Sequence, residues 1–159
     1  MINVLILCTG NSCRSVIGEA LFNHLGEGRI KAWSAGSFPT GTVNPNATSV
    51  LGEHGISTLG LSSKSWDELG SIEFDIVITV CDNAQGETCP VYLNKAIKAH
   101  WGLPDPADVI GNGKEIMEAF ETTYLALQNR ITMMLKLPLE LMSEKEIKDS
   151  LEEIGTEKT

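Results

Sequence analysis

Residues 4–15 read VLILCTGNSCRS, an apolar run that changes abruptly into a polar loop with cysteine and glycine. Four apolar residues in succession are typical of a strand buried on both faces of a parallel sheet. Apolar residues at helical spacing follow from Val16 to Leu25, and Gly26 and Gly28 mark the end of that helix. The sequence therefore predicts a strand, a loop and a helix in direct succession.

The alternation of strands and helices continues along the chain. The expected strands lie at residues 4–7, 30–34, 74–80 and 98–101, and the expected helices at 15–25, 44–55, 65–69, 116–135 and 143–154. This pattern predicts an α/β fold, a three-layer single domain whose central four-stranded parallel sheet carries helices on both faces. We expect a loop at 82–90 and a frayed tail from Gly155. Ligands of such sheets bind beyond the carboxyl ends of the strands, where Cys8 and Cys81 both fall.

The composition is that of an ordinary globular domain with an acidic surface. Of the 159 residues, 42% are hydrophobic and 21% are charged, which suffices for one core. A formal charge of −9 argues against nucleic acid and anionic membranes as partners, and an anionic substrate would need a local positive site. The sequence shows neither an apolar span of membrane length nor a signal peptide, so we expect a cytoplasmic protein.

Cys8 and Arg14 form the pattern Cys-x5-Arg, followed directly by Ser15. In a loop of this length the backbone N–H groups can turn inward, and the positive end of the next helix adds to them, so the loop can bind an oxyanion. Arg14 can hold two anion oxygens, and the same positive field is expected to lower the pKa of Cys8. We expect Ser15 to donate to the Cys8 thiolate, Gly10 to turn where a side chain would clash, and Asn11 to accept left-handed geometry.

The context of this pattern, more than its spacing, favours a functional site. In a chain with four cysteines, the spacing alone also arises by chance. Here the match begins where a buried strand ends, and its last residues open a helix. That position is the one at which α/β sheets bind ligands.

The loop 8–15 resembles the signature of the low-molecular-weight tyrosine phosphatase superfamily, and specifically its arsenate reductase branch. The likeness spans nearly all of residues 1–135. Further matches to that branch are Ser34-Ala35-Gly36, Asn44-Pro45, Val80-Cys81, Cys89-Pro90, His100-Trp101-Gly102 and Asp105-Pro106. The resemblance implies a phosphatase-like arsenate reductase domain over residues 1–137. Residues 138–159 extend beyond the compact members of the family and are interpreted as a C-terminal helical extension of the same domain.

The resemblance also implies the roles of individual residues. Cys8 would be the nucleophile, Arg14 and Ser15 would assist it, and Asp105 would be the general acid that protonates the leaving oxygen. An Asp-Pro pair taken by itself is more often a plain turn. The implied oxyanion-binding loop consists of Thr9, Gly10, Asn11, Ser12, Cys13 and Arg14, and Cys13 is interpreted as a structural thiol.

Cys81 and Cys89 distinguish a reductase from a phosphatase, which needs only one thiol. The resemblance implies that arsenate becomes arsenite through a thiol adduct on Cys8 and a Cys8-Cys81-Cys89 disulfide relay, as in arsenic detoxification. Phosphate or sulfate would compete with arsenate. Thioredoxin is the expected electron donor. The spacing of eight between Cys81 and Cys89 is one more than we associate with thioredoxin-coupled members, so a glutathione and glutaredoxin route stays open.

Other readings of the same residues remain. A tyrosine phosphatase is disfavoured because Ala107 follows Asp105-Pro106, where phosphatases usually offer an aromatic residue to a phosphotyrosyl ring. A non-catalytic thiol module that binds arsenite or another soft metal is the second alternative, and a weak phosphatase activity on small substrates is the third. Cys81 and Cys89 can also be read as inert cysteines. A zinc site is disfavoured by the wide spacing of Cys81 and Cys89. We expect no resident metal and no cofactor.

A group that supports the loop is implied by the same resemblance. Asn11, Glu19, Ser34 and position 64 resemble the cation site that some arsenate reductases fill with potassium, but position 64 is Lys64 and not an acidic residue. We expect the ammonium of Lys64 to replace the ion, to pair with Glu19 and to steady Asn11, so that activity does not require potassium. The alternative is that Lys64 is a solvated surface charge.

Overall fold

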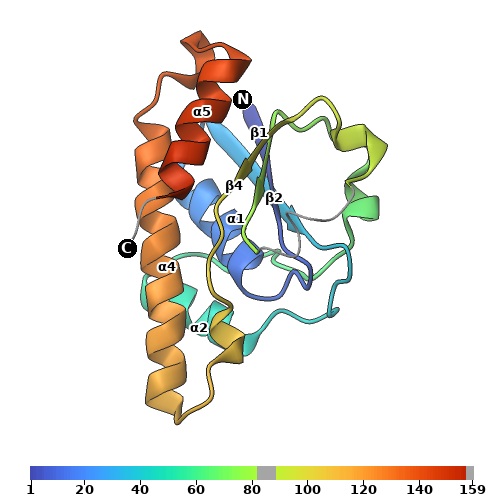
Figure 1. Cartoon of the computed structure of the whole chain (residues 1–159). Coiled ribbons are helices and arrows are strands. Elements are labelled where there is room, and N and C mark those ends of the chain that lie inside the picture. The colour runs from blue at the N-terminus through green and yellow to red at the C-terminus, as the bar shows by residue number, and fades with distance from the viewer. Residues whose placement is uncertain (82–88, 157–159) are drawn as a thin grey trace.

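The computed structural model describes residues 1–81 and 89–156 (Figure 1). Within these residues, one parallel sheet has the strand order β2-β1-β3-β4. The strands are β1 (Ile2–Leu7), β2 (Ile30–Ala35), β3 (Ile76–Thr79) and β4 (Ile97–His100). The predicted four-stranded parallel sheet is confirmed. Because β1 pairs with both β2 and β3, the loop that begins at Cys8 leaves from the middle of the sheet.

The helices connect and cover the strands. The α-helices of the described residues are α1 (Arg14–Leu25), α2 (Pro45–Glu53), α4 (Gly113–Leu135) and α5 (Glu144–Gly155). The short 3-10 helices are η1 (Trp66–Leu69), η2 (Val91–Leu93), η3 (Pro106–Asp108) and η4 (Leu139–Leu141). None of the described helices combines the length and apolar character needed to cross a bilayer.

The two faces of the sheet bury different elements. The α-helices pack on one face, where Val4 and Ile6 of β1 enter the core, and α4 and α5 lie side by side there (Figure 1). On the other face Leu5 and Leu7 contact η1 and η2. Alternate residues of β1 thus enter two separate cores, as expected for a central parallel strand. The three-layer α/β prediction is confirmed.

Capping residues explain where several helices begin. Asn44 accepts a hydrogen bond from the N–H of Asn46 at the start of α2, and Ser143 forms the predicted capping box at the start of α5. α4 begins at Gly113, earlier than the predicted 116, because the side chain of Asn112 accepts from a backbone N–H of the first turn. α1 begins at Arg14 and not at residue 15.

Some predicted boundaries are wrong. The run 74–80 pairs only over Ile76–Thr79, and the last strand ends one residue before Trp101. Gly155, predicted to be frayed, is helical and packs on β4, where an added Cβ would lie 2.3 Å from the carbonyl oxygen of His100. Of the predicted loop at 82–90, residues 82–88 lie outside the described part.

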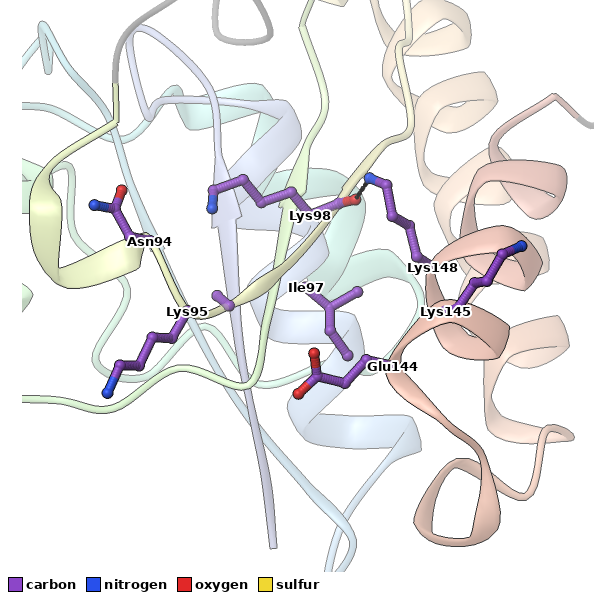
Figure 2. A pocket seen from close by; sticks show the side chains of 8 residues that line it. Asn94, Lys95, Ile97, Lys98, Glu144, Lys145 and Lys148 are labelled. Atoms are coloured by element: carbon purple, nitrogen blue, oxygen red, sulfur yellow. Dashed lines mark hydrogen bonds between the residues drawn. The ribbon is translucent and has the colours of Figure 1, made fainter.

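Strand β4 is an edge of the sheet and carries lysines. Figure 2 shows the pocket of about 640 Å³ between β4 and α5, in which the Nζ of Lys148 donates to the carbonyl oxygen of Lys98 at 2.6 Å. Lys95 and Lys145 also line it. Lysine side chains and an occupied backbone acceptor hinder the pairing of an edge strand with another chain. We therefore interpret these lysines as protection of the sheet edge.

Candidate active site

The loop between β1 and α1 is held from outside by the segment that follows β2. Three carbonyl oxygens of the loop each accept a hydrogen bond of 3.0 Å from a backbone N–H of this segment. The pairs are Thr9 with Phe38, Gly10 with Thr40, and Ser12 with Asn44. Within the described part of the chain, the backbone N–H groups of residues 11–13 donate to no other atom. The loop therefore turns its carbonyls outward and keeps donors for an anion.

Asn11 adopts the left-handed conformation that we predicted for it. Its φ is 46°, and the residue is fully buried. Its Nδ2 donates to the Oγ of Ser15 at 2.8 Å, and its Oδ1 accepts from the N–H of Lys64 at 2.8 Å. These bonds tie the middle of the loop to α1 on one side and to residue 64 on the other.

Gly36, and not Gly10, is the glycine that the loop requires for space. An added Cβ at Gly10 would lie 3.4 Å from Thr40 and 3.9 Å from Ser12, both ordinary contacts, so the predicted clash there is wrong. An added Cβ at Gly36 would lie 2.3 Å from the carbonyl oxygen of Thr9 and 2.7 Å from that of Cys8. In the sequence, Gly36 stood out only as part of a family match. Its role depends on a contact between β2 and a loop distant in the chain.

Cys8 and Cys81 lie together at the carboxyl ends of β1 and β3. Both residues are buried, and the N–H of Thr9 donates to the Sγ of Cys81 at 3.4 Å. A hydrogen bond with Cys81, followed by burial, raises the pKa of Cys8, whereas Arg14 and the N–H of Gly10 act in the opposite direction. The prediction of a lowered pKa is wrong for this arrangement because a second thiol contacts the first.

Ser15 is placed differently from the prediction. Its hydroxyl is fully buried and accepts from Asn11, and among the described residues it makes no hydrogen bond to Cys8. Cys8 interacts instead with Cys81 and with the N–H of Gly10. Ser15 retains a hydroxyl proton that it can donate.

Arg14 and Asp105 meet, although they lie on separate elements. The Nη2 of Arg14 is 3.4 Å from Oδ2 of Asp105, and its Nη1 donates to the carbonyl oxygen of Leu103 at 2.8 Å. The Nε of Arg14 is buried and has no partner among the described residues. Asp105 also caps η3 by accepting from the N–H of Ala107 at 3.0 Å. The structure thus places the predicted acid against the predicted anion-binding guanidinium.

The remaining cysteines lie in different surroundings. Cys13 is buried beside Ser12, with 3.6 Å between Sγ and Oγ, and burial raises its pKa. Cys89 is partly buried and packs against the core on the opposite face of the sheet, near Tyr92. The structure therefore does not place Cys89 in the same core as Cys8 and Cys81. In residues 1–81 and 89–156, no group of three or more acidic, histidine or cysteine side chains is arranged to hold a metal ion.

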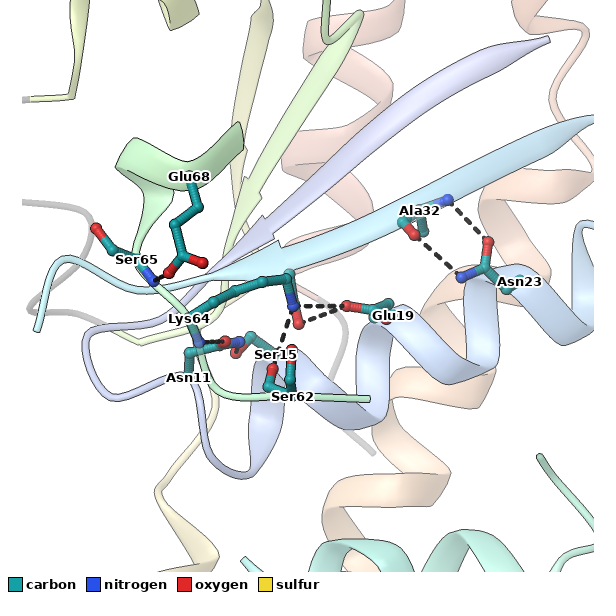
Figure 3. Close-up of polar contacts among 10 residues, drawn as sticks. Asn11, Ser15, Glu19, Asn23, Ala32, Ser62, Lys64, Ser65 and Glu68 are labelled. Carbon is teal, nitrogen blue, oxygen red and sulfur yellow. Dashed lines mark hydrogen bonds and ion pairs between the residues drawn. The ribbon is translucent and has the colours of Figure 1, made fainter. Parts of the chain in front are cut away.

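Lys64 points into the molecule toward Glu19 (Figure 3). Its Nζ is 3.7 Å from Oε1 of Glu19, and the two side chains are only 17% and 13% exposed. The same carboxylate oxygen accepts from the Oγ of Ser34 at 2.7 Å, and Nζ also donates to the carbonyl of Ser62 at 3.1 Å. The four residues of the predicted support group therefore lie together, and the burial of Lys64 does not fit a solvated surface charge.

Arg130 is a charged residue near the site that we did not single out in the sequence. It lies on α4, is 4% exposed, and its Nη1 donates to the carbonyl oxygens of Trp101 at 3.0 Å and of Gly102 at 3.4 Å. A signal was present, because position 130 follows Leu127 at helical spacing on the apolar face. A charged residue on the apolar face of a helix indicates that its side chain has a hydrogen-bond partner in the interior.

A parallel α/β sheet with a Cys-x5-Arg loop at the end of its central strand defines a class of phosphatase-like proteins. The chain belongs to the low molecular weight phosphotyrosine protein phosphatase family, which it matches over residues 3–150. It is 34% identical over 129 residues to an arsenate reductase of Halalkalibacterium halodurans, a match that covers 80% of this chain and 91% of that protein.

Two solved structures show the same similarity. The structure described as an arsenate reductase in the phosphate binding state has a TM-score of 0.69 and 28% identity, and the match covers 83% of this chain and 95% of that one. The thioredoxin-dependent arsenate reductase of Corynebacterium glutamicum has a TM-score of 0.58 and 26% identity, with 83% of this chain and 62% of that one covered.

Proposed function

We propose that this protein is an arsenate reductase that converts arsenate to arsenite in arsenic detoxification. The observation that carries the proposal is that two buried thiols, Cys8 and Cys81, follow neighbouring strands beside a loop with unused N–H donors. The N–H of Thr9, the residue after Cys8, donates to the Sγ of Cys81 at 3.4 Å. A phosphatase needs the first thiol alone, whereas a reductase needs the second to supply electrons. The relatives named arsenate reductases support this choice.

The loop offers a tetrahedral oxyanion several kinds of donor. The N–H groups of residues 11–13 and the positive end of α1 would surround it, and Arg14 would reach it with its buried Nε. Phosphate and sulfate have the same geometry as arsenate and would compete. A similar protein described in a phosphate binding state agrees with this expectation.

In the first step, the Cys8 sulfur attacks arsenic and an arsenic–oxygen bond breaks. Asp105 donates a proton to the departing hydroxyl, which leaves as water. The contact of Asp105 with Arg14 supports this role because it brings the acid to the anion. The product of the step is an arsenic(V) adduct on Cys8.

In the second step, the Cys81 sulfur attacks the Cys8 sulfur. A disulfide forms, the sulfur–arsenic bond breaks, and its electron pair stays on arsenic, which leaves as arsenite. Arsenic(V) is thereby reduced to arsenic(III) while two thiols are oxidised. The contact between Cys8 and Cys81 supports this order of events, because the second thiol is already beside the first.

In the third step, Cys89 attacks Cys81, which releases Cys8 and forms the Cys81-Cys89 disulfide. Cys89 packs on the other face of the sheet, so Cys81 and Cys89 must approach for this step. A disulfide requires Cα atoms about 5.5 Å apart. We propose thioredoxin as the reductant of this disulfide, supported by the thioredoxin-dependent neighbour from Corynebacterium glutamicum.

The test uses the reduced protein with excess arsenate and no electron donor. We expect one arsenite per protein and, by mass spectrometry, a Cys81-Cys89 disulfide. Cys89→Ser should still release one arsenite but stop at a Cys8-Cys81 disulfide, and Cys81→Ser should release none. Hydrolysis of phosphotyrosine without any disulfide would identify a phosphatase, and arsenite binding without turnover would identify a thiol module.

The electron donor is tested in steady state. Thioredoxin with its reductase and NADPH should sustain many turnovers in wild type and none in Cys89→Ser. Glutathione with glutaredoxin should give at most the single turnover. Sustained turnover of Cys89→Ser with glutathione and glutaredoxin would contradict the proposed relay and support the glutathione and glutaredoxin route.

A further inference from the structure

The segment from Trp101 to Asp105, here called the acid loop, connects β4 to η3 and carries the proposed general acid. Its first part continues the sheet, since the N–H of Trp101 donates to Thr79 at 2.7 Å and that of Leu103 donates to Val80 at 3.0 Å. Its last part meets the anion site, because Arg14 contacts both Leu103 and Asp105. The position of Asp105 therefore depends on how both ends of the acid loop are held.

Arg130 holds the start of the acid loop from α4. Its guanidinium donates to two successive carbonyls, those of Trp101 and Gly102, at 3.0 Å and 3.4 Å. Burying a cation is costly, so a buried arginine needs good hydrogen bonds in return. The two bonds, both donated by Nη1, restrain the peptide between the two carbonyls. The second residue, Gly102, has no side chain that could restrain the backbone at this point.

Helix α5 supplies a second anchor at the same place. The Nε1 of Trp101 donates to the carbonyl oxygen of Leu151 at 2.8 Å, and Gly155 packs directly on the His100 carbonyl. Trp101 is fully buried and stacks on Phe22 of α1, with 6.0 Å between ring centroids. The start of the acid loop is thus fixed by three helices, and Arg130 is the one charged side chain found among these contacts in the described residues.

We propose that Arg130 is a positioning residue that sets the place of Asp105 through the acid loop. This inference rests on the proposed function, in which Asp105 protonates the leaving oxygen. Arg130 bonds to the start of the loop, while Arg14 bonds to its end and to the acid itself. A catalytic group displaced by about 1 Å can lose two orders of magnitude in rate, so the loop anchor affects chemistry more than substrate binding.

The test compares Arg130→Met and Arg130→Lys with wild type in single-turnover formation of arsenite. We expect Arg130→Met to lower the rate constant by about 10- to 100-fold, with the arsenate concentration at half-maximal rate changed far less. Arg130→Lys should recover part of the rate, because an ammonium can still donate to one carbonyl.

Arg29→Met is the matched control for loss of stability. Arg29 also donates to two backbone carbonyls, those of Leu135 and Leu137 at 2.6 Å and 2.5 Å, but these lie at and just after the C-terminal end of α4 and are not part of the acid loop. The Arg29→Met variant should have a lower melting temperature and the wild-type single-turnover rate. Gly155→Ala tests the anchor without touching Arg130, since its Cβ must displace the His100 carbonyl. It should reduce the rate even if Arg130→Met fails to fold.

The outcomes separate this inference from the proposed function. A folded Arg130→Met protein with the wild-type single-turnover rate would overturn the positioning role, as would an equal loss of rate in Arg29→Met. Absence of arsenite from wild type would overturn the proposed function instead. In that case the carboxyl carbon resonance of Asp105 still decides, because it should move in Arg130→Met and stay unchanged in Arg29→Met if Arg130 positions the acid.

Discussion

The pKa of Cys8 depends on its neighbour Cys81. Because the hydrogen bond with Cys81 is the largest cause that raises the pKa of Cys8, Cys81→Ala should lower that pKa and leave Arg14 to act on it. The thiolate is the reactive form and is lost as pH falls through the pKa, so Cys8 in the variant should stay reactive at lower pH. The rate of iodoacetamide labelling at Cys8, followed by mass spectrometry across a pH series, measures this shift.

The same sign applies to stability. The pKa of Cys8 is higher in the folded protein than in the unfolded chain, so the folded protein binds this proton more tightly. The protonated Cys8 therefore contributes to the free energy of unfolding at low pH. This contribution is lost as the pH rises above about 8.5, the pKa of an unfolded thiol. The free energy of unfolding of wild type should therefore decline more steeply in this range than that of Cys81→Ala. Labelling curves that coincide for the two proteins would show that Cys81 does not control Cys8.

Lys64 should occupy the place of a cation beside Glu19. Wild type should show no change in activity when potassium replaces sodium at fixed ionic strength. Lys64→Ala leaves a mostly buried carboxylate without its ammonium, which should cost about 1–3 kcal/mol of stability. Potassium should then recover part of that loss, measured as a rise in melting temperature over sodium.

Lys145→Ala is the control for the Lys64 experiment. Its ammonium pairs with Asp149 on the surface, where both side chains are mostly exposed. The melting temperature of this variant should stay near that of wild type in either salt. Potassium stimulation of wild type would contradict the assignment of Lys64 as the replacement for the ion.

At the level of elements, the approach of β2 to the loop allows a paired test of two glycines. Gly36→Ala places a Cβ 2.3 Å from the Thr9 carbonyl and should displace the loop, with loss of phosphate binding and of arsenate turnover. Gly52→Ala, in α2, meets nothing within 4 Å and should stabilise the protein by about 0.4–1 kcal/mol. Calorimetric titration with phosphate and thermal unfolding of both variants check the pair. Wild-type phosphate affinity in Gly36→Ala would refute the close approach.

The elements that the sequence predicted well are those set by local signals. The apolar run before Cys8 became β1, and the capping residues Asn44 and Ser143 became the starts of α2 and α5. Asn11 also took the left-handed geometry that its residue type tolerates. Each of these features depends on a few consecutive residues, so periodicity and capping rules suffice.

The features that the sequence could not predict depend on contacts between distant segments. The raised pKa of Cys8 comes from Cys81, and the need for Gly36 comes from a loop that precedes it by a whole helix and strand. Arg130 reaches the acid loop only because α4 packs beside it. No short stretch of sequence contains both partners of any of these contacts. Only Arg130 had a local signal, because it is a charged residue on the apolar face of α4.

At the scale of the whole molecule, the strand order assembles the site. Because β1 and β3 are neighbours, the residues after their carboxyl ends, Cys8 and Cys81, meet although they are far apart in the chain. β4 lies beside β3 and leads into the acid loop, and Gly36, directly after β2, contacts the loop between β1 and α1. The proposed nucleophile, the proposed second thiol and the proposed acid thus follow three adjacent strands, at the edge of the sheet where parallel sheets bind ligands.

We propose that residues 138–159 belong to the same cooperative unit as residues 1–137. Leu151 of α5 is fully buried in the core shared with β1 and α4, and its carbonyl accepts from Trp101. Leu151→Ala should therefore cost about 2–5 kcal/mol, whereas Leu141→Ala, at an exposed position, should cost little. Denaturant unfolding of both variants, followed by helical circular dichroism and by the indole N–H resonance of Trp101, should give coincident transitions because Trp101 and α5 share one core. A separate early loss of helical signal, with the Trp101 resonance unmoved, would instead identify α5 as an appendage and remove its role in anchoring the acid loop.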